Sequence, residues 1–142
     1  MKQRSKARIV NDVPLLEAEL VEYPGNRRML LHLGKTLIIL SKLKKARGVL
    51  DQITVSKEYD QYDFEARRLA YALALNDGGD PLDQEQALRD LCRDHPKRAE
   101  PPYYLAFLMR SVGRIKEAFE WIMKAASLEP EGGMSIQKKI YA

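Results

Sequence analysis

The sequence predicts an all-α fold of stacked helix hairpins, and three observations support this prediction. Apolar residues recur at positions i, i+3 and i+4 along most of the 142 residues, which is the period of an amphipathic helix. Runs that alternate apolar and polar residues are few, and no Asn-Gly or Asp-Gly turn lies between β-branched segments. A pair made of leucine and a small residue returns after 36 residues, twice over. A regular return of this kind is typical of repeat proteins.

Residues 1–10 are expected to form a basic, flexible arm, since chain ends order poorly unless they are held. No apolar segment follows this arm, so a secretory signal is not expected. A lone helix is expected at 12–23, where Asn11 or Asp12 can cap it and Pro14 fits its first turn. Pro24 then ends this helix, because proline cannot continue a helix.

Each hairpin is expected to have a first helix with a leucine–small pair and a second helix with an alanine. The small residue lets the neighbouring helix approach closely. The pairs of the first helices are Leu33-Gly34, Leu69-Ala70 and Leu105-Ala106. In the second helices, a large apolar residue follows the alanine by four positions, so both lie on one face. These pairs are Ala46 and Leu50, Ala87 and Leu91, and Ala118 and Ile122.

Prolines mark the boundaries of the expected units, with Pro96 and Pro130 lying 34 residues apart. The expected repeat domain covers 11–130, with units at about 27–60, 63–96 and 99–130. In the middle unit, "DGGDPLDQ" predicts a long turn and a short second helix at about 84–94. Residues 131–142 are expected to form a C-terminal tail or a short capping helix, with Ser135 as its cap.

These units resemble the tetratricopeptide repeat, whose consensus reads W-x2-L-G-x2-Y, then A-x3-F, then P. The last unit, "AEPPYYLAFLMRSVGRIKEAFEWIMKAASLEP", matches best. Its residues in family positions are Leu105, Ala106, Gly113, Ala118, Ala125 and Pro130. The resemblance implies a right-handed superhelical stack of antiparallel helix hairpins, about three repeats plus flanking helices. It also implies a concave groove, lined by the first helices, that binds peptides or partner domains.

The resemblance assigns groove-facing positions to residues of the first helices. The expected partner-binding residues are Lys35, Ile38, Phe64, Arg67, Tyr71, Tyr103, Phe107 and Arg110. Because Tyr, Phe and Arg are common interface anchors, a peptide or helix with apolar and acidic side chains is the expected ligand. In one alternative, the C-terminal segment or the N-terminal arm of this chain covers Tyr71 and Phe107 instead. A two-carboxylate clamp for C-terminal peptides is not expected, since its asparagines are missing.

The segment Gly34-Lys35-Thr36 has the letters that end a phosphate-binding loop. Such a loop requires a glycine five positions before Gly34, where this sequence has Met29. No strand or glycine-rich turn precedes the segment either. The repeat explains the same letters as a helix contact at Gly34 and a groove position at Lys35, so a nucleotide is not an expected ligand.

No catalytic residue, cofactor or metal ligand is predicted. His32 and His95 belong to no evident Ser-His-Asp or Cys-His set. Cys92 is expected to be a small buried hydrophobic residue, and a single cysteine excludes an intramolecular disulfide and a four-cysteine zinc site. The aspartates around Gly78-Gly79 lack the twelve-residue pattern of a calcium loop. The predicted function is therefore a non-catalytic scaffold or adaptor.

The net charge of +4 is unevenly spread, and this leaves further alternatives open. Residues 1–48 hold 11 Lys/Arg against 4 Asp/Glu, while the remainder holds 13 against 16. One alternative is nucleic-acid or membrane-surface binding by the basic N-terminal region, although no aromatic residues interleave with its cations. Another is an accessory segment of, or a partner to, a larger enzyme such as a glycosyltransferase.

Two expectations concern location and assembly. No apolar run reaches the roughly 18 to 20 residues that would cross a bilayer. The absence of a signal peptide and the single cysteine favour a cytoplasmic location. A homodimer through an exposed repeat end is a further alternative.

Overall fold

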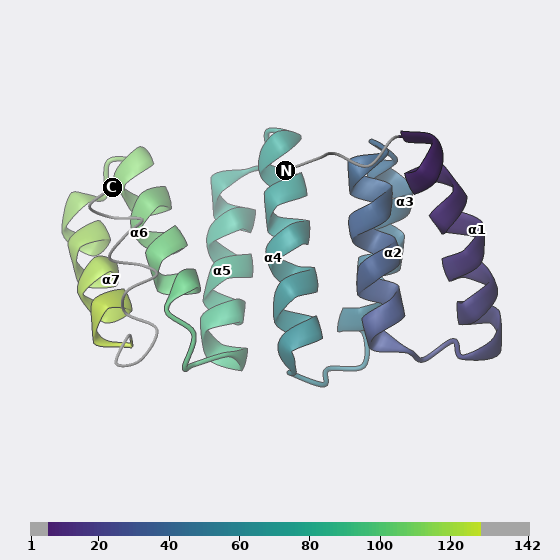
Figure 1. The fold of residues 1–142 in the computed structure, drawn as a ribbon. Coiled ribbons are helices and arrows are strands. Elements are labelled where there is room, and N and C mark those ends of the chain that lie inside the picture. The colour runs from purple at the N-terminus through teal and green to yellow at the C-terminus, as the bar shows by residue number, and fades with distance from the viewer. Residues whose placement is uncertain (1–5, 129–142) are drawn as a thin grey trace. The chain divides into compact units, whose positions relative to one another are not determined.

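The computed structural model describes residues 6–128, which form seven helices and no strand, so the all-α prediction is confirmed (Figure 1). The chain divides into two compact units, residues 1–73 and 74–142, and each is described here by itself. The boundary between the units falls within α4 (Gln61–Asn76). The expected tail at 131–142 and residues 1–5 of the expected N-terminal arm lie outside the described residues, whereas residues 6–10 of that arm are helical.

The first unit contains α1 (Lys6–Glu22), α2 (Arg27–Ile39), α3 (Leu43–Thr54) and most of α4. Helices α2 and α3 pack side by side as a hairpin, and α1 packs against α2. One apolar cluster joins all four helices. Its fully buried members are Leu37, Ala46, Leu50, Ile53 and Ala66.

Gly34 marks the closest approach between α2 and α3. A Cβ atom built on Gly34 would lie 2.8 Å from Cδ2 of Leu50, which is closer than two carbon atoms can pack. The predicted role of Gly34 as a small contact residue is therefore confirmed. The same geometry explains why Leu50, four positions after Ala46, is fully buried.

Arg27 ties α4 to the α2–α3 hairpin within this unit. Its guanidinium donates two 2.7 Å hydrogen bonds to the carboxylate of Asp60, the residue just before α4. It also donates to the carbonyls of Ile53 and Glu58 and to the Ser56 hydroxyl, so all five of its donors are used. The bond from Arg27 is the main cause that lowers the pKa of Asp60.

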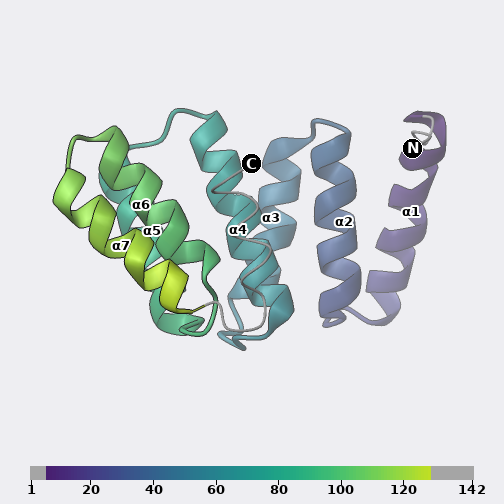
Figure 2. The same ribbon diagram turned by 60° about the vertical axis from the view of Figure 1, so that its left-hand side comes forward.

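The second unit contains the end of α4 together with α5 (Pro81–Asp94), α6 (Glu100–Ser111) and α7 (Ile115–Ser127). Helices α6 and α7 form a hairpin, and Figures 1 and 2 both show them side by side. Helix α5 packs against α6. Leu88, Leu105, Met109 and Ala125 are almost fully buried.

The three first helices end in the same backbone motif. At the end of α2, the amide of Ser41 donates to the Ile38 carbonyl and the amide of Lys42 donates to Leu37. This pair of bonds is a Schellman cap, which requires a left-handed residue at its turn. That residue is Ser41 after α2, with φ of 60°, and glycine after α4 and α6: Gly78 and Gly113.

Helix α1 begins earlier than the sequence suggested. It starts at Lys6 rather than at residue 12, and Pro14 lies inside it. The buried Val13 and Leu16 continue, at helical spacing, the apolar stripe that also includes Ile9 and Leu20. This stripe stabilises the turns before Pro14, although proline removes one backbone hydrogen bond there.

Helix α5 also begins earlier than expected, at Pro81 rather than at residue 84. Asp80 caps it by accepting a 2.9 Å hydrogen bond from the Leu82 amide. The expected pair Ala87 and Leu91 is wrong, because Ala87 is exposed while Leu88 is fully buried. The turn before α5, residues 77–80, is one residue longer than the turns before α3 and α7. The buried face of α5 is therefore displaced from the positions that the 36-residue interval predicts.

Candidate partner-binding surface

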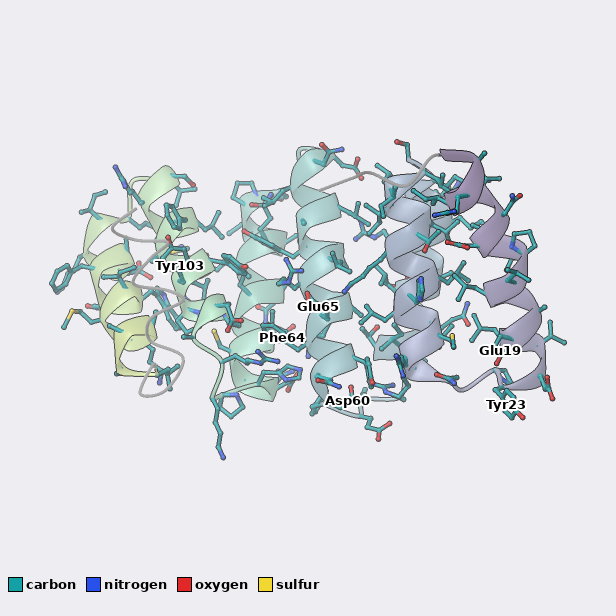
Figure 3. The ribbon with its side chains drawn as sticks, in the orientation of Figure 1. Glu19, Tyr23, Asp60, Phe64, Glu65 and Tyr103 are labelled. Carbon is teal, nitrogen blue, oxygen red and sulfur yellow. The ribbon has the colours of Figure 1, made fainter. Side chains whose placement is uncertain are left out.

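The eight predicted partner-binding residues lie in both units, and they differ in how exposed their side chains are. Lys35, Phe107 and Arg110 are exposed, whereas Ile38, Arg67 and Tyr71 are half-buried and Phe64 and Tyr103 are buried. Figure 3 shows Phe64 on α4 and Tyr103 on α6. Only 3% of Phe64 is exposed, so the free chain does not offer this ring to a ligand. Large aromatic rings at helical spacing are commonly core residues, which explains this difference.

In the first unit, the predicted residues sit on α2 and on the part of α4 that ends at Leu73. Lys35 extends from the middle of α2, while Ile38 packs against the apolar cluster. Arg67 is positioned by Asp63, whose carboxylate lies 3.3 Å from its Nη1, and by the Tyr59 ring, whose centroid lies 5.9 Å away. These contacts fix the orientation of the Arg67 guanidinium. Because Asp63 already uses part of it, fewer of its N–H donors can bind a carboxylate of a partner.

The Gly34-Lys35-Thr36 segment has a regular helical conformation. It lies within α2, and the Thr36 hydroxyl donates a 2.9 Å hydrogen bond to the His32 carbonyl four residues earlier. Backbone amides in a helix interior are already bonded to the preceding turn. They are therefore not arranged as a phosphate cradle.

In the second unit, α6 and α7 form an open apolar hollow of about 390 Å³, called the α6–α7 hollow. Its lining residues are Tyr103, Ala106, Phe107, Arg110, Ile115, Ala118, Phe119 and Ile122. Three of the predicted residues are therefore brought together in it: Tyr103, Phe107 and Arg110. The rings of Tyr103 and Phe107 meet edge to face, with centroids 4.8 Å apart.

Several large apolar side chains that line the hollow are exposed next to one another. Phe107 is 51% exposed, Ile115 62% and Phe119 65%. Sequence reasoning missed Ile115 and Phe119 as site residues. The available signal was their spacing with Met123 at i, i+4 and i+8, which gives α7 an apolar stripe in addition to the face formed by Ala118 and Ile122.

Arg110 is the charged residue of the hollow. Its side chain is exposed and makes no ion pair with another residue in the described range 6–128. Arginine presents a planar set of donors that matches a carboxylate with two parallel bonds. The hollow therefore combines apolar contact area with one group that favours an anion.

A polar network holds the hollow's second helix to α5. Arg114 donates to Glu117 and, at 2.7 Å, to Glu85 of α5. Arg89, also on α5, lies 5.4 Å from the centre of the Trp121 ring and 2.8 Å from Glu85. These bonds lower the pKa of the Glu85 carboxyl, with Arg89 as the first cause and Arg114 as the second. The α5-facing side of α7 is thus polar and already occupied.

The described residues show no arrangement suited to catalysis by cysteine or metal. Burial raises the pKa of the Cys92 thiol to about 11, so it stays protonated at neutral pH and is a weak nucleophile. Over residues 6–128, no group of three or more His, Cys, Asp or Glu side chains could hold a metal ion. None of the described helices has the length and apolar composition needed to cross a membrane.

Comparisons with known proteins identify the fold. No protein-family model matches the sequence, and no curated protein matches it either. Among solved structures, MamA MSR-1 C2 superposes with a TM-score of 0.63 at 18% identity, over 88% of this chain and 70% of that one. A MamA RS-1 ArsTM double mutant gives 0.65 at 19%, over 87% and 67%. A third MamA structure gives 0.63 at 19%, over 92% and 77%.

MamA is a tetratricopeptide-repeat protein, so the predicted tetratricopeptide-like fold is confirmed. The chain is an all-α helical-repeat protein in which each unit contains one complete first-and-second-helix hairpin. Sequence identities of 18 to 19% support a similar fold and no further similarity.

Proposed function

We propose that this chain is a non-catalytic protein-interaction module, a scaffold or adaptor that binds a peptide or helix of a partner protein on the exposed faces of its first helices. The α6–α7 hollow is the proposed contact surface. The observation that carries the proposal is the combination of exposed Phe107 and Phe119 with Arg110 in one hollow.

The physical basis is the free energy of burying exposed rings. Burying a fully exposed side chain of this size contributes about 1.5 to 3 kcal/mol. Phe107 is 51% exposed and Phe119 65%, so covering both rings contributes about 2 to 3.5 kcal/mol, out of roughly 8 kcal/mol for a micromolar affinity. Aromatic residues and arginine in a shared pocket are the usual centre of an interface. A ligand with a large apolar side chain and a nearby carboxylate complements this surface.

A displayed library of random helical peptides would test the proposal even though the partner is unidentified. Selection on the wild-type chain is expected to enrich sequences with large apolar residues and Asp or Glu three or four positions apart. The triple variant Phe107→Ala, Arg110→Ala, Phe119→Ala is expected to lose about 100-fold in affinity for the selected peptides.

The matched control is Leu82→Ser, which removes an exposed apolar side chain on α5 outside the hollow. It should leave peptide affinity unchanged. Equal binding by the triple variant and the wild type, with helix content intact by circular dichroism, would refute the proposed surface.

A second candidate, nucleic-acid or membrane-surface binding, is favoured by one observation. The four cations of the α3 region, Lys42, Lys44, Lys45 and Arg47, are all exposed. Binding to a generic oligonucleotide would then weaken steeply with salt, by a slope near −1 for each phosphate contact. A slope near zero would exclude nucleic-acid binding, and a lack of binding to anionic lipid vesicles would exclude membrane-surface binding.

A further inference from the structure

The α2–α3 hairpin and the α6–α7 hairpin differ in what covers them. In the first unit, Ala66 and Leu73 of α4 belong to the buried cluster that contains Leu50 and Ile53. Leu50 is fully buried there, whereas its equivalent 72 residues later, Ile122, is half-buried and lines the hollow. No residue in the described range takes the place of α4 over the α6–α7 hollow.

The sequence beyond α7 continues the 36-residue interval. Ala99 precedes the first residue of α6, and 36 positions later stands Ser135, which is a strong helix cap. The pair Leu105-Ala106 is followed at the same interval by Tyr141-Ala142, again a large apolar residue and a small one. Residues 135–142 therefore have the pattern of the start of another first helix.

We propose that residues 135–142 dock on the α6–α7 hollow as a short helix and compete there with the partner peptide. Ile136, Ile140 and Tyr141 supply apolar side chains for the exposed rings. The competition rests on the proposed function, whereas the docking does not.

The length of the segment makes this contact reversible. An isolated helix shorter than about 12 to 15 residues is marginal in water, so residues 135–142 need the hollow to hold their structure. Residues 128–134 join the segment to the end of α7, and such a short tether gives an effective concentration on the order of millimolar. Even with weak affinity, the segment then occupies the hollow in the free chain, and a partner with higher affinity displaces the segment.

Amide hydrogen exchange on the full chain tests the docking. The amides of residues 139–142, which are the first able to bond within the helix, are expected to exchange about tenfold or more slowly than in an unstructured peptide. Phe119→Ser should abolish this protection, while the control Leu82→Ser should preserve it. Unprotected amides in the wild type, or equal protection in Phe119→Ser, would overturn the docking.

Two further measurements separate the alternatives. Protection that increases with protein concentration, together with the mass of a dimer by light scattering, would show that a second copy fills the hollow and would refute the proposal. Ile140→Asp should release the segment and strengthen binding of a selected peptide about tenfold, because the hollow is then free more often. Unchanged affinity would refute the competition, whereas a complete lack of peptide binding with protected amides would refute the proposed function alone.

Discussion

The α2–α3 and α6–α7 hairpins have equivalent residues 72 positions apart, but these residues are packed differently in the two hairpins. Gly34 stands where Ala106 stands, and its missing side chain lets Leu50 fill the space between the helices. The α6–α7 hairpin keeps the hollow at the matching place, lined by Ala106 and Ile122. The same spacing of apolar residues therefore gives a closed core in one hairpin and an open site in the other, depending on the neighbour available.

The sharpest test of this difference compares two equivalent positions. Leu50→Ala is expected to lower the free energy of unfolding by about 3 to 4 kcal/mol, because it leaves a cavity in a fully buried place. Ile122→Ala should cost about 1 kcal/mol, since the half-buried site already meets solvent. Urea unfolding followed by circular dichroism measures both. Equal losses would show that the two hairpins are packed alike.

A side chain at Gly34 should break the close approach of α2 and α3. Gly34→Val is expected to cost about 3 kcal/mol, because its Cβ would overlap the buried Leu50 and its branches leave no room to shift. Gly48→Ala is the matched control, since nothing lies within 4 Å of a Cβ there. That control should gain about 0.5 to 1 kcal/mol from helix propensity. Both values follow from urea denaturation midpoints.

The Arg27 contacts distinguish the first unit from the second. Arg27→Ala is expected to cost about 2 to 3 kcal/mol, because it removes five donated bonds and leaves the Asp60 carboxylate without its guanidinium partner. Arg27→Lys should recover only part of this, since an ammonium cannot form the two parallel bonds. The more exposed Arg114 network of the second unit should contribute less, so Arg114→Ala is a useful contrast in thermal unfolding.

The same contact predicts a pH dependence. Asp60 has a lowered pKa in the folded chain, so its contribution is present above the unfolded value near 3.9. This stability is lost as the pH falls from about 5 through the folded pKa. Unfolding free energies of the wild type and Asp60→Asn should converge over this range. Parallel curves would argue against the ion pair.

The smallest effect concerns the caps of the first helices. Ser41 is left-handed after α2, at the position where Gly113 stands after α6, and a side chain makes this conformation costly. Ser41→Gly is therefore expected to raise stability by about 0.5 to 1 kcal/mol, and Gly113→Ser should lower it by a similar amount. Thermal melts of the two variants should shift in opposite directions.

Much of the fold could be predicted because the leucine–small pairs report directly on helix contacts. The pairs located α2, α4 and α6, and the Gly34 contact has the expected cause. The starts of α1 and α5 were missed because Pro14 and Pro81 were interpreted from local rules alone. Pro14 is exposed within α1, and the buried Val13 and Leu16 stabilise the helix around it, while Pro81 follows the Asp80 cap.

The candidate site was harder to predict, because periodicity gives the face of a helix but not its neighbours. Phe64 and Tyr103 share the expected face with Phe107, but they are buried. Phe119 and Ile115 were missed for the opposite reason, since an apolar stripe on a second helix is normally covered. Exposure depends on which chain segment packs against each face, and a local sequence pattern does not encode this.

Trp121 has a practical consequence for every unfolding experiment on this chain. It is the single tryptophan, and it lies on α7 in contact with Arg89 of α5. Its fluorescence is therefore an optical reporter of the second unit, whereas circular dichroism averages over all helices. Transitions that coincide by both signals would indicate one cooperative event, and separated transitions would give each unit its own stability.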